Sequence, residues 1–196
     1  MNQLVKEPGA TIGTPVPKIL NIGSGKDFRD DCLNIDVLDR VNPDIVVDLS
    51  RGIPDREFDT RFGPVNLRHH QFERAVAYDV LEHVPDLIPF MESVRDLLVI
   101  GGVFDVLVPY DLGYGAWQDP THVRAFNEKS WLYYTEWAWY LGWNEYKFHI
   151  PQIIYHPSEI GQKRLDHGIQ LVDLLLMPRC IDAMKVEMVK VEVASN

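Results

Sequence analysis

The feature that most constrains the fold is a glycine turn placed directly after an apolar run. Residues 18–22 read Lys-Ile-Leu-Asn-Ile and are followed by Gly23-Ser24-Gly25. An apolar run stopped by glycines is typical of a buried strand that enters a tight turn. Glycines at such a place let the backbone approach a ligand closely. A G-x-G turn alone is also compatible with a purely structural role.

Acidic residues near the ends of the next two predicted strands favour a ligand. We expect strands over residues 33–37 and 44–48, which carry Asp36 and Asp48 toward their carboxyl ends. In doubly wound sheets these ends line one crevice, and an acid at the second strand hydrogen-bonds ribose hydroxyls. The glycine turn and the two acids therefore predict one binding crevice at the carboxyl edge of a sheet.

The rest of the chain predicts an α/β layer with a mostly parallel sheet, because buried strands alternate with a helical crossover. Further strands are predicted over residues 75–78, 103–109, 145–150 and 184–193. Residues 85–100 carry apolar side chains at spacings of three and four, which is typical of a helix, and Gly101-Gly102 should end it. A second, aromatic helix is predicted over residues 129–141. We expect residues 51–68 and 156–168 to be loops.

Composition limits the class of protein. The chain has 196 residues with 46% hydrophobic and 24% charged, which predicts a soluble globular domain without a membrane span. A net charge of −10 disfavours a non-specific nucleic-acid grip. The two cysteines, Cys32 and Cys180, form no CxxC pair, so neither a disulfide framework nor a cysteine-rich zinc site is expected, and the cytoplasm is the expected compartment.

Five short motifs in order resemble the class I S-adenosylmethionine-dependent methyltransferases. They are LNIGSG, NIDV, DIVVDLS, AYDVLEHV and RDLLVIGGVFDVLVPYD, and the resemblance covers residues 18–135. It implies a Rossmann-like seven-stranded sheet, mostly parallel, whose last strand is antiparallel. Residues 184–193 would be that strand. We expect residues 1–17 to form a flexible arm, residues 18–196 a single domain, and residues 110–150 an aromatic-rich cap inserted after the fifth strand.

The resemblance also implies the residues that hold S-adenosylmethionine. The turn of Gly23, Ser24 and Gly25 would wrap the methionine part, and Asn21 stands where the family often has an acid. Asp36 with Val37 would bind the ribose. The remaining implied contacts are Asp48 and Leu49 beside the adenine, and Asp79, Val80 and Leu81 under the sulfonium.

A nicotinamide-dependent oxidoreductase is the first alternative, and two features speak against it. Phe28 stands where the third glycine of G-x-G-x-x-G would be, and the interval from Gly25 to Asp36 is shorter than the ~20 residues of that fingerprint. A cofactor-binding or scaffold protein of the same fold without turnover remains a second alternative.

Candidate catalytic residues follow the fifth predicted strand. Related methyltransferases often carry a segment similar to Asp119-Pro-Thr-His122 near the acceptor. His122 is therefore the first candidate base, aided by Asp119, although it is equally compatible with packing. His83, within LEHV, is a weaker candidate and is more often a packing residue.

A metal is the alternative way to activate an acceptor. On a helical turn Asp79, Glu82 and His83 would share a face, and with His122 they offer two carboxylates and two imidazoles to a divalent ion. Because Asp79 ends a predicted strand instead of lying in a helix, we expect no metal.

Aromatic residues gather in one stretch of the chain. Of the 21 aromatic residues, 13 fall between Tyr110 and Phe148, including all five tryptophans. They are compatible with the core of a cap or with an acceptor pocket. The sequence thus predicts in-line methyl transfer to a small-molecule or glycan acceptor, with nucleic acid disfavoured.

Overall fold

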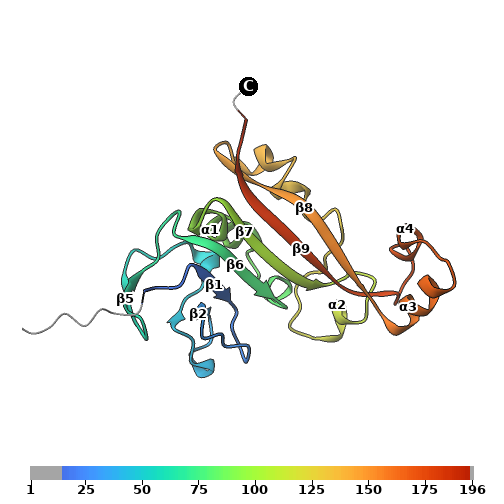
Figure 1. Cartoon of the computed structure of the whole chain (residues 1–196), viewed down its shortest axis with the longest axis horizontal. Coiled ribbons are helices and arrows are strands. Elements are labelled where there is room, and N and C mark those ends of the chain that lie inside the picture. Colours follow the sequence, from blue (N-terminus) through green and yellow to red (C-terminus); the bar gives the residue numbers. More distant parts are fainter. Residues whose placement is uncertain (1–14, 195–196) are drawn as a thin grey trace, which may run out of the picture.

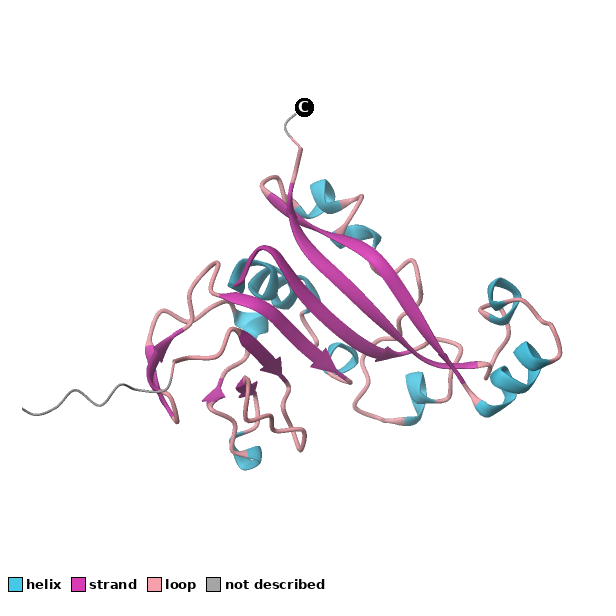
Figure 2. Cartoon of the chain, viewed as in Figure 1, coloured by secondary structure: helices cyan, strands magenta, loops and turns pink. Residues whose placement is uncertain are grey.

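Seven strands form one mixed sheet in the computed structural model, which describes residues 15–194 (Figures 1 and 2). The strand order is β3-β2-β1-β6-β7-β9-β8. The strands of this sheet are β1 (Ile19–Ile22), β2 (Leu33–Asp36), β3 (Ile45–Val46), β6 (Phe72–Tyr78), β7 (Leu98–Pro109), β8 (Tyr146–Pro157) and β9 (Ile181–Glu192). The predicted arm over residues 1–17 lies almost wholly outside the described residues.

Strand directions match the predicted topology. Strands β3, β2, β1, β6 and β7 pair in parallel, and β9 is antiparallel to both β7 and β8. The prediction of a mostly parallel seven-stranded sheet with an antiparallel last strand is therefore confirmed. The carboxyl ends of the parallel strands meet at one edge, and this edge carries the candidate site.

The helix α1 (Leu87–Leu97) covers one face of the sheet (Figure 2). Its apolar stripe is buried, with Met91 and Val94 fully inaccessible. The helix is shorter than predicted, because β7 begins at Leu98 and already contains Gly101-Gly102. The short 3-10 helix η2 (Leu49–Arg51) packs against α1, and Ser93 Oγ donates a hydrogen bond to the Leu49 carbonyl.

The connections on the cofactor side of the sheet are unusually short. Residues 23–32 join β1 to β2 without a helix, and the 3-10 helix η1 (Asp39–Val41) lies between β2 and β3. On the sheet face opposite α1, Arg74 of β6 pairs with Asp105 of β7, and Lys185 of β9 lies 3.9 Å from the same carboxylate. This face therefore carries charged side chains where the α1 face is apolar.

Residues 51–68 are not the loop that we expected. They contain a two-stranded hairpin of β4 (Glu57–Thr60) and β5 (Gly63–Asn66). Phe58 and Val65 are opposite each other and both are buried, which gives the hairpin one apolar side. Gly63, with φ of 89°, makes the turn that closes it.

The predicted aromatic helix over residues 129–141 is also wrong. The chain forms two 3-10 turns instead, η4 (Leu132–Tyr134) and η5 (Ala138–Leu141). Thr135 Oγ1 hydrogen-bonds the carbonyl of Trp131, and such a side-chain bond competes with helix formation. The neighbouring aromatic side chains lose rotamer freedom in a helix, which further disfavours it.

Residues 156–168 contain a helix where a loop was predicted. The helix α3 (Glu159–Asp166) begins at Ser158, whose Oγ accepts a hydrogen bond from the Gly161 amide at 3.0 Å. The short helix α4 (Leu171–Leu174) follows, and both lie beyond the end of the long β8–β9 pair (Figure 1). Strand β8 runs from residue 146 to 157, well past the predicted end at 150.

Candidate active site at the carboxyl edge of the sheet

A cavity of 260 Å³ opens where the ends of β1, β2 and β3 meet the loop after β6. Six of the predicted cofactor residues line it, together with His83 and several apolar side chains. The six are Gly23, Asp36, Val37, Asp48, Leu49 and Val80. The apolar part of the wall includes Ile22, Ile35, Val47 and Phe90. Carboxylates at two places around an apolar slot suit a nucleoside, whose ribose is a diol and whose base is flat and apolar.

Gly23 brings the turn after β1 into close contact with the loop after β6. Its φ is 64°, a conformation that side chains rarely adopt. A Cβ built there would lie 2.4 Å from Val80 Cγ2, so any side chain would clash. Position 23 therefore requires a glycine for two reasons: the positive φ of the backbone and the lack of room for a Cβ beside Val80.

Asp36 braces the glycine turn as well as lining the cavity. Its Oδ2 accepts a hydrogen bond from the Gly25 amide at 2.9 Å, and its Oδ1 accepts one from the Leu38 amide at 2.8 Å. Each carboxylate oxygen keeps further acceptor capacity. The residue therefore holds the turn in shape and can still accept hydroxyl protons from a ligand.

Asn21, in strand β1, supports the turn from behind, and Ser24 is its middle residue. Asn21 Nδ2 donates to the Asp27 carbonyl at 2.7 Å and to Asn34 Oδ1 at 2.9 Å, which makes it a support for the turn. Ser24 is buried, and its Oγ has no hydrogen-bond partner within the described residues. A buried hydroxyl in this position fits a polar group of a ligand held by the turn.

Asp48 sits at the start of η2 and is already engaged. Its Oδ1 accepts hydrogen bonds from the Ser50 amide at 3.0 Å and the Ser50 hydroxyl at 2.6 Å. Burial raises the pKa of this carboxyl, but the bonds from Ser50 and Arg51 outweigh it and hold the pKa below its usual value. Asp48 is therefore a fixed negative charge at the cavity wall.

The residues after β6 divide into two groups. Leu81 is fully buried in the core, so it supports the wall without lining it. Asp79 has φ of 54°, and its amide donates to the Leu107 carbonyl at 2.9 Å. Burial raises the pKa of Asp79, while His122 and His83 oppose the shift.

A hydrogen bond between main chains brings the predicted catalytic segment to this edge. The Val123 amide donates to the Glu82 carbonyl at 2.8 Å, joining residues 119–124 to the 3-10 helix η3 (Leu81–His83). As a result the His83 and His122 rings lie 4.6 Å apart in an edge-to-face arrangement. The two histidines that the sequence singled out are thus neighbours.

The Asp119 carboxylate contacts His83 through Thr121, and its link to His122 runs through the main chain, where the His122 amide donates to the Asp119 carbonyl at 3.2 Å. Thr121 Oγ1 donates to Asp119 Oδ1 at 2.7 Å and lies 3.0 Å from His83 Nδ1. These bonds from Thr121 lower the pKa of Asp119. No side-chain hydrogen bond joins Asp119 to the His122 ring within the described residues, and the prediction that Asp119 aids His122 stays a prediction.

Glu82 was not among the residues expected to bind the cofactor or to act as a base. It is 1% exposed, and neither carboxylate oxygen has a hydrogen-bond partner within the described residues. Burial raises its pKa to about 7, and the charge of Asp79 adds to this shift. The signal available in the sequence was an acid inside the apolar stretch from Val80 to Val84.

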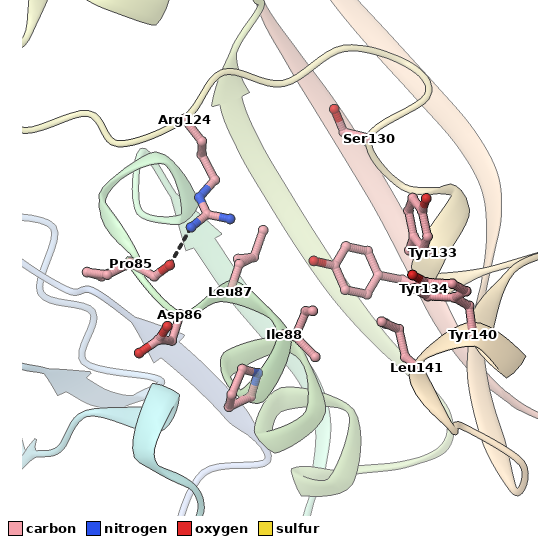
Figure 3. A pocket seen from close by; sticks show the side chains of 11 residues that line it. Pro85, Asp86, Leu87, Ile88, Arg124, Ser130, Tyr133, Tyr134, Tyr140 and Leu141 are labelled. Atoms are coloured by element: carbon pink, nitrogen blue, oxygen red, sulfur yellow. Dashed lines mark hydrogen bonds between the residues drawn. The ribbon is translucent and has the colours of Figure 1, made fainter.

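A second and larger pocket lies beside the cofactor cavity, on the other side of Pro85. It measures 480 Å³ and shares Pro85 with the cavity wall. Figure 3 shows Arg124 and Pro85 on one side of this pocket and Tyr133, Tyr134 and Tyr140 on the opposite side. Arg124 donates to the Pro85 carbonyl at 2.6 Å, while its buried Nε has no partner within the described residues. We call this the tyrosine pocket.

Comparisons with known proteins bear on the fold. A methyltransferase dependent on S-adenosylmethionine from Archaeoglobus fulgidus superimposes with a TM-score of 0.57 at 11% identity, covering 89% of this chain and 86% of that one. The chain has the class I methyltransferase fold. The [4+2]-cyclase SpnF superimposes with a TM-score of 0.53 at 16% identity, covering 92% of this chain and 77% of that one.

Sequence comparisons add nothing to this fold assignment. No family model matches the chain, and no curated protein matches it either. No helix in residues 15–194 is long and apolar enough to cross a membrane. Since SpnF is named as a cyclase, the methyltransferase fold does not fix the reaction, and the function has to be inferred from the site.

Proposed function

We propose that this protein transfers the methyl group of S-adenosylmethionine to a small-molecule or glycan acceptor. The observation that carries the proposal is the cavity in which Gly23, Asp36 and Asp48 surround an apolar slot. The volume of the slot and the carboxylate acceptors at its wall fit the nucleoside part of the cofactor, whose ribose hydroxyls can donate to them. The buried, unpartnered Ser24 hydroxyl in the adjoining turn fits the polar methionine part.

The residues of this chain supply binding and orientation. When bound, S-adenosylmethionine supplies a reactive methyl sulfonium, so no protein nucleophile is needed. Asp36 would accept the ribose hydroxyl protons, and the glycine turn would hold the methionine part next to Asp79. The protein then has to bring the acceptor atom in line at near-attack distance.

The tyrosine pocket supports an acceptor of the proposed class. It adjoins the cofactor cavity, and aromatic faces together with Arg124, Asp86 and Ser130 line it. Flat apolar surfaces mixed with hydrogen-bonding groups suit a sugar ring or a planar hydroxylated molecule. The net charge of −10 speaks against a nucleic-acid acceptor.

The histidine pair would act on the acceptor atom. His83 lines the cofactor cavity and His122 lies directly behind it. The role of His122 as a base stays a prediction. A base is needed only where the acceptor must lose a proton, as a hydroxyl must.

The cofactor assignment is tested by titrating S-adenosylhomocysteine into the protein in a calorimeter. We expect one saturable site, and Asp36→Ala should weaken binding by roughly 1.5–3 kcal/mol, the scale of a hydrogen bond that involves a charged group. Asp39→Ala is the matched control, because Asp39 is an exposed acid three residues further on that does not line the cavity. Binding of NAD without binding of S-adenosylhomocysteine would refute the proposal.

A further inference from the structure

Glu82 is the most unusual polar group among the described residues. Its carboxylate is 1% exposed and both oxygens lack a hydrogen-bond partner. A buried carboxylate without partners is costly, so native structures nearly always satisfy it with a donor, a water molecule or an ion. The side chain lies next to the two histidines, of which His83 lines the cofactor cavity. The structure therefore calls for a positively charged or proton-donating ligand at this point.

His122 presents a lone pair toward Glu82. Its Nδ1 lies 3.1 Å from the Ala116 carbonyl, which accepts hydrogen bonds only, so Nδ1 carries the proton. In the neutral ring Nε2 is then unprotonated, and it lies 4.0 Å from Glu82 Oε1. That distance is too long for a direct hydrogen bond. A direct pair would also leave the second carboxylate oxygen unsatisfied.

His83 is fixed in the same tautomer by a chain of hydrogen bonds. The Thr121 hydroxyl donates its one proton to the Asp119 carboxylate. Its oxygen therefore accepts a hydrogen bond from His83 Nδ1, which lies 3.0 Å away. The neutral ring then keeps its free lone pair on Nε2. Metal-binding histidines characteristically donate their other ring N–H to a carbonyl, a carboxylate or a similar oxygen, which orients the ring. Both histidines show this arrangement, with Ala116 and Thr121 as the outer partners.

We propose that Glu82, His83 and His122 together bind one divalent first-row transition-metal ion. One donor atom from each residue lies within 4.8 Å of the others. Two ligands of one ion lie at most about 4.2 Å apart, twice a metal–nitrogen distance of about 2.1 Å. The pair of Glu82 and His122, 4.0 Å apart, already meets this limit, and the distances to the third donor exceed it by at most about 0.6 Å. Two imidazoles and one carboxylate favour a transition-metal ion over a purely oxygen-liganded one.

The proposed ion would face the cofactor cavity with open coordination positions. Three protein ligands leave at least one position for water or substrate, as in catalytic metal sites. His83 lines the cofactor cavity, so an open position on the His83 side of the ion would face that cavity. If the proposed methyl transfer holds, an acceptor hydroxyl bound to the ion would lose its proton more readily. This proposal departs from the expectation from the sequence that no metal is bound, because the sequence could not show that the Glu82 carboxylate lacks a hydrogen-bond partner.

The experiment measures metal binding directly and needs neither cofactor nor acceptor. Protein stripped with a chelator and dialysed is titrated with Zn²⁺ in a calorimeter, and with Co²⁺ while the visible absorption is followed. We expect one saturable site and Co²⁺ bands that Zn²⁺ abolishes. The variants His83→Gln, His122→Gln and Glu82→Gln should each weaken Zn²⁺ binding at least tenfold. His149→Gln, on strand β8 and outside the cluster, is the matched control and should bind as the unaltered protein does.

Two outcomes would overturn the metal site. One is the absence of saturable Zn²⁺ binding, and the other is binding that none of the three substitutions weakens. Because Glu82 is buried, its variant could fail to fold, so His83→Gln, at the cavity surface, carries the test if circular dichroism shows that Glu82→Gln is unfolded. Zn²⁺ binding without S-adenosylhomocysteine binding would keep the metal site and remove the proposed methyl transfer. Binding of S-adenosylhomocysteine without binding of Zn²⁺ would keep the proposed methyl transfer and remove the metal site.

Discussion

Gly23 is the residue at which the cofactor cavity is most sensitive to a single added carbon. Gly23→Ala combines strain at φ of 64° with a Cβ 2.4 Å from Val80 Cγ2. We expect S-adenosylhomocysteine binding to weaken at least tenfold and the free energy of unfolding to fall by about 2–4 kcal/mol, from backbone strain and overpacking together. Calorimetry and urea unfolding measure the two effects.

Gly101→Ala separates the two causes, because Gly101 has φ of 80° and no atom within 4 Å of the point where a Cβ would lie. It should lose only the strain component, about 1–2 kcal/mol, and keep its ligand binding. The double variant Gly23→Ala, Val80→Ala should recover part of the loss. Equal losses in Gly23→Ala and Gly101→Ala would show that the contact with Val80 is unimportant.

Single residues were predictable where the chemistry lies in the residue type and its place after a strand. Gly23, Asp36 and Asp48 follow this rule, and all three line the cavity. Asn21 also lies at the end of a strand, but its side-chain amide donates both of its hydrogen bonds within the protein and supports the turn. Glu82 was named in the sequence only as one of four possible metal ligands. That its carboxylate is buried without a hydrogen-bond partner depends on contacts between segments far apart in the chain, which a local pattern does not show.

At the scale of elements, strand β9 buries a lysine among apolar residues. Lys190 is fully buried, and its Nζ donates to the Leu98 carbonyl at 2.8 Å. Burial lowers the pKa of Lys190 to about 8. The unfolded chain, with a pKa near 10.5, binds more protons than the folded one between these two values. The charged lysine therefore lowers stability below pH 8, and this penalty disappears as the pH rises toward 10.5.

Lys190→Met removes the titrating group at similar length. We expect the stability of the unaltered protein relative to this variant to increase by roughly 1–3 kcal/mol between pH 8 and pH 10. Urea unfolding at several pH values measures the difference. Lys185→Met, on the same strand but partly exposed, should show a much smaller dependence on pH. A flat difference for Lys190→Met would mean that its pKa is not lowered.

Strands and the one long helix could be predicted, because their apolar periodicity is local. Strand β1 and helix α1 lie within two or three residues of their predicted bounds. The helix α3 was missed although Ser158 is a good N-cap, because the surrounding Pro157 and Gly161 favoured a loop. In the aromatic stretch over residues 129–141 a helix was predicted where none forms. Its side chains pack against the sheet core and the tyrosine pocket instead of forming one helical stripe.

At the scale of the whole molecule, the two halves of the sheet carry different pockets. Strands β1, β2 and β3 with their short connections form the cofactor cavity, and the chain between β7 and β8 forms the wall of the tyrosine pocket. The order of strands makes this division, because the chain crosses from one half to the other after β3. In the proposed reaction, cofactor and acceptor would meet at the junction of the two pockets, which both contain Pro85.

The tryptophans, which dominate the intrinsic fluorescence, all lie on the tyrosine-pocket side of this division. All five tryptophans lie between residues 117 and 143, and none lines the cofactor cavity. Trp131 and Trp143 are buried, whereas Trp117, Trp137 and Trp139 are exposed. Intrinsic fluorescence should therefore contain a population that acrylamide quenches and a blue-shifted population that it does not reach. S-adenosylhomocysteine should change this emission little, while a molecule seated among the tyrosines next to Trp137 and Trp139 should change it strongly, so candidate acceptors can be screened by fluorescence without any turnover.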